Sequence, residues 1–278
     1  MTREECLERY RAEPLRSRTG ATVTMLSKLK DAKYRTEYGL YLAEGVKLTE
    51  EALVCPDTAV EMLFVSEDGL QNQRILACLD AAWEKNIPIK LASPEVFEKA
   101  ATEKAPQGII AVLKKQSDDS FVFRPDGRYM LLDTIQDPGN LGTILRSAVA
   151  FGIDGLILYR CADPTGPKTV RASMGALFRC PVKITEDLAE TVQALRQDGH
   201  RVLAAALAEN SLCAGRTELQ PADCVIIGNE GHGVSTDIIE LCSGVIRIPM
   251  QAVTESLNAS VAASILLWEY YRTFGAEG

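Results

Sequence analysis

Three segments in the C-terminal half of the chain combine glycines with amide, hydroxyl and carboxylate side chains that could bind a ligand. They are DTIQDPGNLGT at 133–143, GNEGHGVS at 228–235 and MQAVTESLNAS at 250–260. Glycine allows a backbone to approach a ligand closely, and the polar side chains can donate or accept hydrogen bonds. A turn or a helix cap would explain the residues of each segment taken alone. A ligand site requires the three segments to lie close together in the folded chain.

The first segment leads into a helix expected over 140–151, which carries the cation Arg146. Asn140 stands where a helix cap is expected, and capping alone would explain it. Arg146 shares a helix face with Gly142, four residues earlier, and could grip a phosphate or a ribose there. A surface salt bridge is the alternative.

The second segment follows an apolar strand directly and holds three glycines within the six residues 228–233. It lacks the GK[ST] of a Walker A loop and the spacing of a GxGxxG fingerprint, which argues against a phosphate cradle. Glycines alone could mark a tight turn. Glu230 stands between them, however, and a turn does not require an acid at that position.

The third segment precedes the last expected helix, with Thr254 or Ser256 as its possible N-cap. Ser256, Asn258 and Ser260 place several neutral hydrogen-bonding groups at the start of this helix. The first backbone N–H groups of a helix have no partner within it. Together, these side chains and the free backbone N–H groups could hydrogen-bond the polar edge of an adenine or a carboxylate group.

Strands that alternate with helices position the three segments. The predicted strands are 129–133, 155–159, 201–207, 224–228 and 245–249, with helices at 140–151 and 256–273 between and after them. This alternation predicts a parallel sheet with right-handed crossovers. Ligands bind such sheets at the carboxyl ends of the strands, and all three segments follow strands there.

Upstream, shorter apolar runs and amphipathic stretches predict a smaller α/β domain. Its strands are expected at 39–45, 61–66, 87–92 and 108–113, and its helices at 46–53 and 70–85. Residues 1–35 are expected to be mostly helical. Polar residues, Pro and Gly gather between 114 and 128 and indicate a connection. We therefore place a first domain at 1–116, a linker at 117–127 and a second domain at 128–278.

The composition is that of a soluble globular protein, with 46% hydrophobic and 24% charged residues. No apolar run is long enough to span a membrane and the N-terminus is charged, so we expect no membrane attachment and a cytoplasmic location. Eight cysteines without a CxxC pair and only two histidines predict no metal site. The thiols are expected to be small buried side chains and not disulfides.

A net charge of −8 argues mildly against a nucleic-acid partner, yet one stretch of the chain is strongly basic. Residues 16–35 hold six cations and a single acid, a balance of +5. Four of these cations are candidate contacts for RNA phosphates: Lys28, Lys30, Lys33 and Arg35. A solvated helix face explains the stretch equally well.

Together the three segments resemble the sequence motifs of the SpoU (TrmH) branch of the SPOUT methyltransferases. The matching sequences are LLDTIQDPGNLGTILRSAVAFGIDGLIL, VIIGNEGHGVS and IPMQAVTESLNASVAASILLWEY, and VRASMGALFRCPV at 170–182 also looks like the family's pattern. Further upstream, KYRTEYGLYLAEGVKLTEEAL and APQGIIAVL resemble the ribosomal-protein-like substrate-binding domain of many family members.

The resemblance implies a homodimeric RNA methyltransferase that transfers a methyl group from S-adenosylmethionine to a ribose 2′-hydroxyl. It implies an α/β fold with a C-terminal parallel-sheet SPOUT domain that holds a trefoil knot, and a smaller N-terminal α/β substrate-binding domain. Carried onto this chain, the catalytic region contains Asn140, Arg146, Glu230, Ser256 and Asn258. Cofactor contacts fall at Leu207, Gly228, Asn229, Gly231, Ile248, Met250, Ser256 and Leu257.

Methyl transfer from a sulfonium is a direct displacement that needs neither a metal nor a covalent nucleophile. A guanidinium stays protonated, so we expect Arg146 to hold a phosphate and stabilise the developing alkoxide rather than to act as a base. Ser256 and Asn258 would orient the ribose or the cofactor, and Glu230 would pair with Arg146.

By analogy, the substrate-binding domain favours a large-subunit ribosomal RNA over a transfer RNA as the substrate. A transfer RNA 2′-O-methyltransferase is one alternative, and a non-catalytic RNA-binding protein of the same fold is another. The intact polar residues of the three motifs argue against loss of activity. A dinucleotide-dependent oxidoreductase would need a glycine fingerprint after the first strand, which this chain lacks.

Overall fold

The computed structural model describes residue 8 and residues 13–116, 121–208, 210–217, 219–229, 231–251 and 256–274. Its contacts divide the chain into two compact units. Unit 1 comprises 1–116 together with 165–179, and unit 2 comprises 117–164 together with 180–278. The segment 165–179, which the sequence groups with the C-terminal domain, packs within unit 1 because helix α8 (Pro167–Ser173) contacts strand β1 (Leu40–Glu44).

Unit 1 is built on a four-stranded sheet with the strand order β1-β4-β2-β3. Besides β1, the strands are β2 (Val60–Ser66), β3 (Ile89–Ala92) and β4 (Ile109–Lys114), so all four predicted strands are confirmed. Strand β4 is antiparallel to β1 and β2, and β3 is parallel to β2. The carboxyl ends of β1, β2 and β3 therefore lie at the same edge of the sheet as the start of β4.

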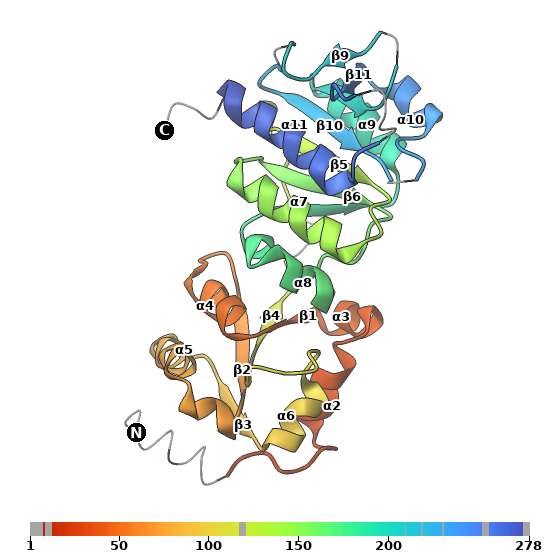
Figure 1. Ribbon diagram of the computed structural model, residues 1–278. Coiled ribbons are helices and arrows are strands. Elements are labelled where there is room, and N and C mark those ends of the chain that lie inside the picture. The colour runs from red at the N-terminus through yellow and green to blue at the C-terminus, as the bar shows by residue number, and fades with distance from the viewer. Residues whose placement is uncertain are drawn as a thin grey trace. The chain divides into compact units, whose positions relative to one another are not determined.

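Helices cover this sheet (Figure 1). They are α2 (Ala21–Lys28), α3 (Ala32–Tyr38), α4 (Val46–Val54), η1 (Glu67–Gln71), α5 (Gln73–Glu84) and α6 (Pro94–Ala100). Residues 13–20 form no helix, because Leu15 pairs with Ala92 beside strand β3. The prediction of a mostly helical 1–35 is wrong for that stretch, and 1–7 and 9–12 lie outside the described residues.

Unit 2 contains a seven-stranded sheet with the order β7-β6-β5-β10-β8-β11-β9, and all its strand pairs are parallel. The strands are β5 (Tyr129–Asp133), β6 (Gly155–Tyr159), β7 (Val182–Thr185), β8 (Arg201–Ala205), β9 (Leu212–Cys213), β10 (Asp223–Ile227) and β11 (Gly244–Arg247). The predicted parallel α/β sheet is confirmed. Strands β7 and β9 were not predicted, because they are short and lie half-exposed at the edges of the sheet.

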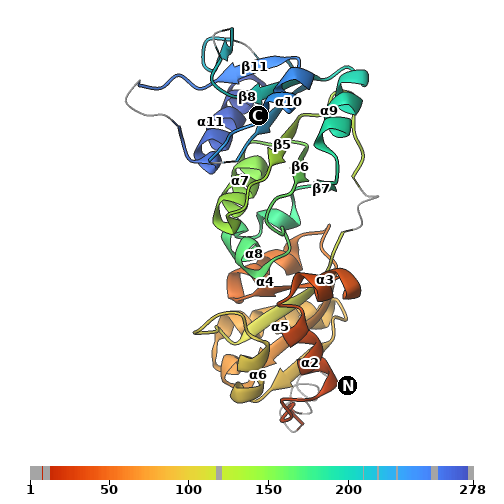
Figure 2. The same cartoon turned by 90° about the vertical axis from the view of Figure 1, so that its right-hand side faces the viewer.

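The helices of unit 2 are α7 (Pro138–Ala150), α9 (Leu188–Gln197), α10 (Thr236–Leu241) and α11 (Ala259–Phe274). Helices α7 and α11 lie side by side (Figure 2), and their hydroxyls Ser147 Oγ and Ser264 Oγ are 2.7 Å apart. The trefoil knot stays a prediction of the resemblance. None of the described helices has the length and apolar character needed to cross a bilayer.

Part of the expected linker belongs to the core of unit 2. Phe121 and Phe123 stack edge-on against each other and pack against the buried ring of Tyr129. The rings of Phe121 and Phe123 hold this part of the expected linker against unit 2, because an aromatic ring buries a large apolar area. Residues 117–120 lie outside the described residues.

Candidate functional site

A cavity of about 440 Å³ lies at the carboxyl ends of strands β8, β10 and β11. All eight residues expected to contact a cofactor line it: Leu207, Gly228, Asn229, Gly231, Ile248, Met250, Ser256 and Leu257. They come from three loops that are far apart in the chain. The parallel sheet brings these loops together because its strands all end at one edge.

The loop after β10 folds back on itself, and this requires glycine at its first position. Asn229 forms an isolated β-bridge with Gly233, whose N–H donates to Asn229 O at 2.8 Å. A Cβ on Gly228 would lie 2.1 Å from the carbonyl carbon of Gly233 and 2.3 Å from the nitrogen of Val234. Backbone atoms cannot yield that far, so only glycine fits at 228. Glu230 lies outside the described residues.

The side chain of Asn229 ties this loop to the one that follows β5. Its Nδ2 donates to Thr134 O at 2.9 Å, and its Oδ1 accepts from Gly231 N at 2.8 Å. Thr134 has a φ of 61°, which is unfavourable for a β-branched residue. Its backbone N–H donates to Tyr159 O at 2.8 Å, so hydrogen bonds on both sides hold the strained residue at the end of the strand.

Helix α7 begins with a different cap from the one expected. Asp137 is its N-cap, and the carboxylate accepts from Asn140 N at 2.8 Å. The prediction that Asn140 occupies the cap position is therefore wrong. Asp137 takes this role because an acidic side chain at the start of a helix accepts from the free N–H groups. The Asn140 side chain is left to make tertiary contacts.

Asn140 meets the third segment directly. Asn258 Nδ2 donates to Asn140 Oδ1 at 3.1 Å across 118 positions of the chain. Asn258 Oδ1 also accepts from Ser260 N at 2.9 Å and from Val261 N at 3.4 Å, so Asn258 caps helix α11. This corrects the expectation that Thr254 or Ser256 is the cap. Ser256 instead lines the cavity, and Thr254 lies outside the described residues.

Arg146 lies exposed on helix α7, two turns after Asn140. Within the part of the chain that the structure describes, its guanidinium has no ion pair or hydrogen bond. The expected pairing with Glu230 stays a prediction. An exposed guanidinium with unused N–H donors can form bidentate hydrogen bonds with a phosphate, or bind a single anionic oxygen.

A second cavity, of about 640 Å³, lies on the other side of the 228–233 loop. Asn229, His232 and Gly233 line both cavities, so the loop is a wall that the two share. The second cavity also contains Thr134 and Arg160, which sequence reasoning missed. Both have positive φ values at strand ends, and no sequence pattern signals this for residues other than glycine.

The cysteine near this cavity is not a nucleophile. Cys161 Sγ donates to Leu132 O at 3.2 Å. Burial raises the pKa of the Cys161 thiol to about 11, so it stays protonated at neutral pH. The seven cysteines that the structure describes are free thiols, and four of them are buried.

The four predicted RNA contacts divide into two pairs. Arg35 is only 4% exposed, and its Nη1 donates to Leu29 O at 2.9 Å and to Lys30 O at 2.8 Å at the end of helix α2. Lys30 Nζ donates to Lys99 O at 2.8 Å, and burial lowers the pKa of the Lys30 ammonium. Arg35 is therefore buried against backbone carbonyls at a helix end, which corrects its assignment as a phosphate contact. Lys30 is exposed and its ammonium has three N–H donors, so its assignment as a phosphate contact stays a prediction.

Lys28 and Lys33 instead surround an aromatic ring. Their Nζ atoms lie 4.9 Å and 5.7 Å from the centroid of Tyr34. Tyr38 lies 5.9 Å from Tyr34, between ring centroids, and its hydroxyl is 3.5 Å from Lys28 Nζ. Two cations beside partly exposed rings form a basic-aromatic surface of the kind that binds single-stranded nucleic acid.

The cavity at the ends of β8, β10 and β11 fits an adenosyl cofactor. Its walls combine apolar side chains, such as Ile227 and Ile246, with glycine backbone at 228, 231 and 233. Apolar walls suit a flat base, and the exposed backbone offers hydrogen-bonding groups to polar edges. The volume lies within the ordinary range for small-molecule sites, roughly 300–1,000 Å³.

Comparison with known proteins agrees with this geometry. Residues 127–268 match the SpoU rRNA Methylase family, and residues 21–111 match the MRM3-like substrate binding domain. An uncharacterized tRNA/rRNA methyltransferase of Synechocystis is 31% identical over 266 residues, which cover 90% of each chain. The 23S rRNA (guanosine(2553)-2'-O)-methyltransferase RlmP of Bacillus subtilis is 32% identical over 242 residues, 87% of this chain and 92% of the relative.

The structural comparison extends over both units. The crystal structure of an AdoMet bound rRNA methyltransferase from Sinorhizobium meliloti has a TM-score of 0.81 at 26% identity, and it covers 94% of this chain and 98% of that one. The family match and the two relatives identify the class of protein. The chain belongs to the SpoU rRNA methylase family, as its three motifs predicted.

Proposed function

We propose that this protein transfers a methyl group from S-adenosylmethionine to a ribose 2′-hydroxyl of large-subunit ribosomal RNA in the cytoplasm. The observation that carries this proposal is that the second and third motif segments meet at one cavity, and that a hydrogen bond from Asn258 to Asn140 joins the first segment to the third. The 23S ribosomal RNA named for RlmP supports the choice of RNA.

The residues around the cavity would have separate roles in binding the cofactor and the ribose. Bound S-adenosylmethionine supplies an electrophilic methyl group. The glycine backbone at 228, 231 and 233 would hold the cofactor, and Ser256 would hydrogen-bond the ribose or the cofactor. Asn140 and Asn258 orient each other and would lie beside the ribose. Alignment of this kind lowers the barrier because the reacting atoms meet without further loss of entropy.

Arg146 would stabilise negative charge rather than remove a proton. Its guanidinium is exposed, and a guanidinium stays protonated at any physiological pH. As the ribose oxygen bonds to the methyl group, the bond from the methyl group to sulfur breaks, S-adenosylhomocysteine leaves, and the hydroxyl proton passes to water. Negative charge develops on the oxygen in this step, and a fixed cation nearby lowers the energy of that state. The same group can contact the neighbouring phosphate of the RNA.

RNA would also contact unit 1, through the basic-aromatic surface formed by Lys28, Lys33, Tyr34 and Tyr38. The two lysines would bind phosphates, and the tyrosine rings would stack on unpaired bases. Arg35 is left out because it is buried and backbone carbonyls bind its guanidinium. Lys30 would be a further phosphate contact, because its exposed ammonium has donors besides the one that binds Lys99 O.

A homodimer would form through the exposed face of helices α7 and α11. Val261 and Trp268 are each 46% exposed on α11, and Tyr271 is 37% exposed. The Phe151 ring, just after α7, packs against the rings of Trp268 and Tyr271. An apolar and aromatic cluster that stays exposed on a monomer marks a protein interface, and a second copy of this chain would cover it.

Replacement of Arg146 tests the proposed chemistry. In the Arg146→Ala variant, we expect methyl transfer to ribosomal RNA to fall by roughly a hundredfold or more, as for other losses of transition-state charge stabilisation. Affinity for S-adenosylmethionine, measured by calorimetry, should stay within about twofold, because the cavity that would hold the cofactor lacks Arg146. Arg216→Ala removes another exposed arginine of unit 2 and should change neither value. Loss of cofactor affinity in Arg146→Ala would show that its role is misassigned.

A further inference from the structure

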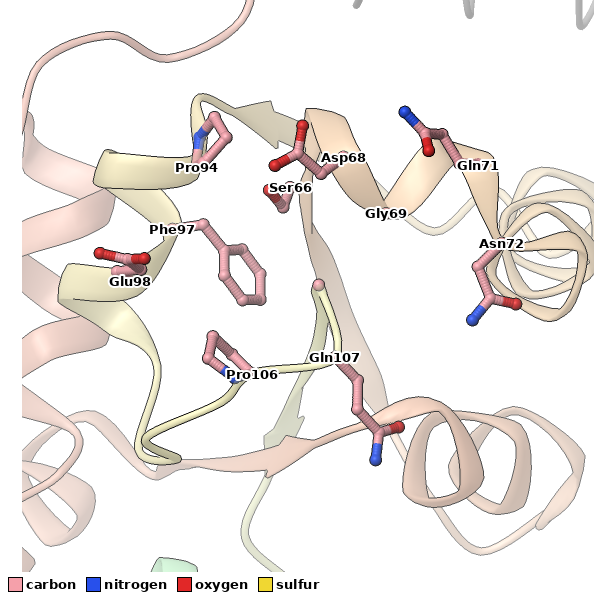
Figure 3. Close-up of a pocket in the computed structure, with 11 residues that line it drawn as sticks. Ser66, Asp68, Gly69, Gln71, Asn72, Pro94, Phe97, Glu98, Pro106 and Gln107 are labelled. Atoms are coloured by element: carbon pink, nitrogen blue, oxygen red, sulfur yellow. The ribbon is translucent and has the colours of Figure 1, made fainter.

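A cavity of about 570 Å³ lies in unit 1, at the carboxyl ends of strands β2 and β3 (Figure 3). Its walls are the end of β2 with η1, the start of α6, and the loop that leads into β4. None of its residues belongs to the three motifs or to the basic-aromatic surface. The size suits a small molecule or a single nucleoside.

Two glycines hold the walls of this cavity together. Gly69 and Gly108 approach so closely that a Cβ on Gly69 would lie 2.9 Å from Gly108 O. Gly108 also has a φ of +86°, and its carbonyl accepts from Ser66 N at 2.9 Å. The loop before β4 is therefore fixed against the end of β2, and the cavity is part of the folded unit.

One end of the cavity is polar and accepts hydrogen bonds. Ser66 is 5% exposed, and within the described residues its hydroxyl has no hydrogen-bond partner. Asp68 follows on η1 and is exposed. Figure 3 shows both side chains pointing from this wall towards α6. The Ser66 hydroxyl is not among the described polar atoms that are cut off from solvent, so it faces the cavity and is available to a ligand.

The opposite side of the cavity is apolar. Pro94 stands at the start of α6, and Pro106 lies in the loop before β4. The ring of Phe97 lies between them in Figure 3, but it is only 1% exposed and stacks on Phe64 at a centroid distance of 5.4 Å, so it closes this side from within the core. The two half-buried prolines are the flat, rigid surfaces that a planar ring can contact.

The charge of the cavity excludes a phosphate as its ligand. No lysine, arginine or histidine lies among the described residues that line it, whereas Asp68 and Glu98 do. Phosphate recognition relies on cations, and two carboxylates would repel it. The fitting ligand is a neutral planar group that donates hydrogen bonds.

We propose that this cavity binds one unpaired guanine base of the RNA substrate, an inference that rests on the function proposed above. Guanine carries two adjacent N–H donors, at N1 and N2, which match the two oxygens of the Asp68 carboxylate. Cytosine and adenine place an acceptor nitrogen beside their amino group, and the carboxylate repels it. The Ser66 hydroxyl accepts or donates a further hydrogen bond. Recognition of splayed bases through their Watson–Crick edges is common in RNA-binding proteins.

The test is binding of short RNAs to the full chain, measured by fluorescence anisotropy. The probes are an oligouridine with one central guanosine, the same oligomer with inosine at that place, and the plain oligouridine. We expect the guanosine oligomer to bind at least about fivefold tighter than plain oligouridine, in line with bidentate base contacts elsewhere. Inosine lacks the N2 amino group and should lose most of this advantage.

Variants of single residues test whether the preference for guanosine arises from this cavity. Asp68→Asn should abolish the preference for guanosine and leave the affinity for plain oligouridine unchanged, and Ser66→Ala should reduce the preference. Asp57→Asn removes an exposed aspartate of unit 1 outside the cavity and should preserve it. A preference that survives Asp68→Asn, or no preference in the unmodified chain, would overturn the proposal.

Two further readouts separate the outcomes. Methyl transfer to ribosomal RNA is measured on the same preparation, because active enzyme without guanosine preference refutes only this inference. Absence of both RNA binding and transfer refutes the proposed function instead. A lysine-containing peptide is the fourth probe. If it binds in an Asp68-dependent way and the chain shows no preference for guanosine, the cavity belongs to a protein partner and the proposal is overturned.

Discussion

At the scale of single residues, the structure separates side chains that hold the fold from those that remain available to a ligand. Arg35 satisfies carbonyls at a helix end, whereas Lys28 and Lys33 lie beside the Tyr34 ring. All three look alike in the sequence. What distinguishes them is the position of the carbonyl groups of Leu29 and Lys30, which depends on how α2 and α3 pack.

The two lysines give a prediction about salt dependence. In the double variant Lys28→Gln/Lys33→Gln, the slope of log affinity against log salt concentration should become shallower by about 1.4, because each lost phosphate contact on single-stranded RNA contributes roughly 0.7. The measurement is RNA binding over a series of potassium chloride concentrations. The control is Lys90→Gln/Lys104→Gln, which removes two exposed lysines of unit 1. An equal slope change in both variants would show a general charge effect.

At the scale of elements, the loop after β10 depends on one glycine and one asparagine. Gly228 permits the chain to fold back against Gly233 and Val234, and Asn229 joins the loop to Thr134. The sequence predicted this loop because three glycines follow an apolar strand. It could not predict the bond to Thr134, since the two residues are 95 positions apart.

Gly228→Ala tests the importance of this loop. The added Cβ would meet backbone atoms at 2.1–2.4 Å, so the loop must shift. We expect a loss of about 1–3 kcal/mol in the free energy of unfolding, as in other overpacked sites, and at least about tenfold weaker binding of S-adenosylmethionine. Urea unfolding and calorimetry measure the two effects.

Gly244→Ala is the matched control, because Gly244 lies outside the cavity. A Cβ there would meet only Leu203 Cδ2, at an ordinary contact distance of 3.7 Å, so cofactor binding should be unchanged. If both variants bind the cofactor normally, the loop is not part of its site.

At the scale of the whole molecule, the α7–α11 face is the surface that most needs a partner. Its aromatic rings remain exposed although the core of unit 2 is well packed. The hydroxyl pair Ser147 and Ser264 fixes the two helices against each other, so the face is preformed. In the proposed homodimer, a second copy of the chain would cover this face.

Trp268→Glu should weaken the proposed dimer by placing a charge in its interface. We expect the sedimentation coefficient to shift from that of a dimer to that of a monomer at micromolar concentration, with at least about tenfold weaker association. Val122→Glu changes another exposed apolar residue of unit 2, which is 72% exposed, and should leave the association unchanged. A monomeric unmodified protein would rule out the proposed dimer.

The sequence by itself determined the parallel α/β sheet, the smaller sheet before it and the three segments at the strand ends. These features follow from local patterns, because the alternation of apolar and polar residues reports burial and glycine reports backbone freedom. The tertiary structure decided that Asn140 bonds to Asn258, that Asp137 caps α7, and that 165–179 packs with unit 1. It also placed Ser66 and Asp68 in a cavity that no motif indicated. Each of these depends on residues far apart in the chain, whose meeting is set by packing and not by their neighbours in sequence.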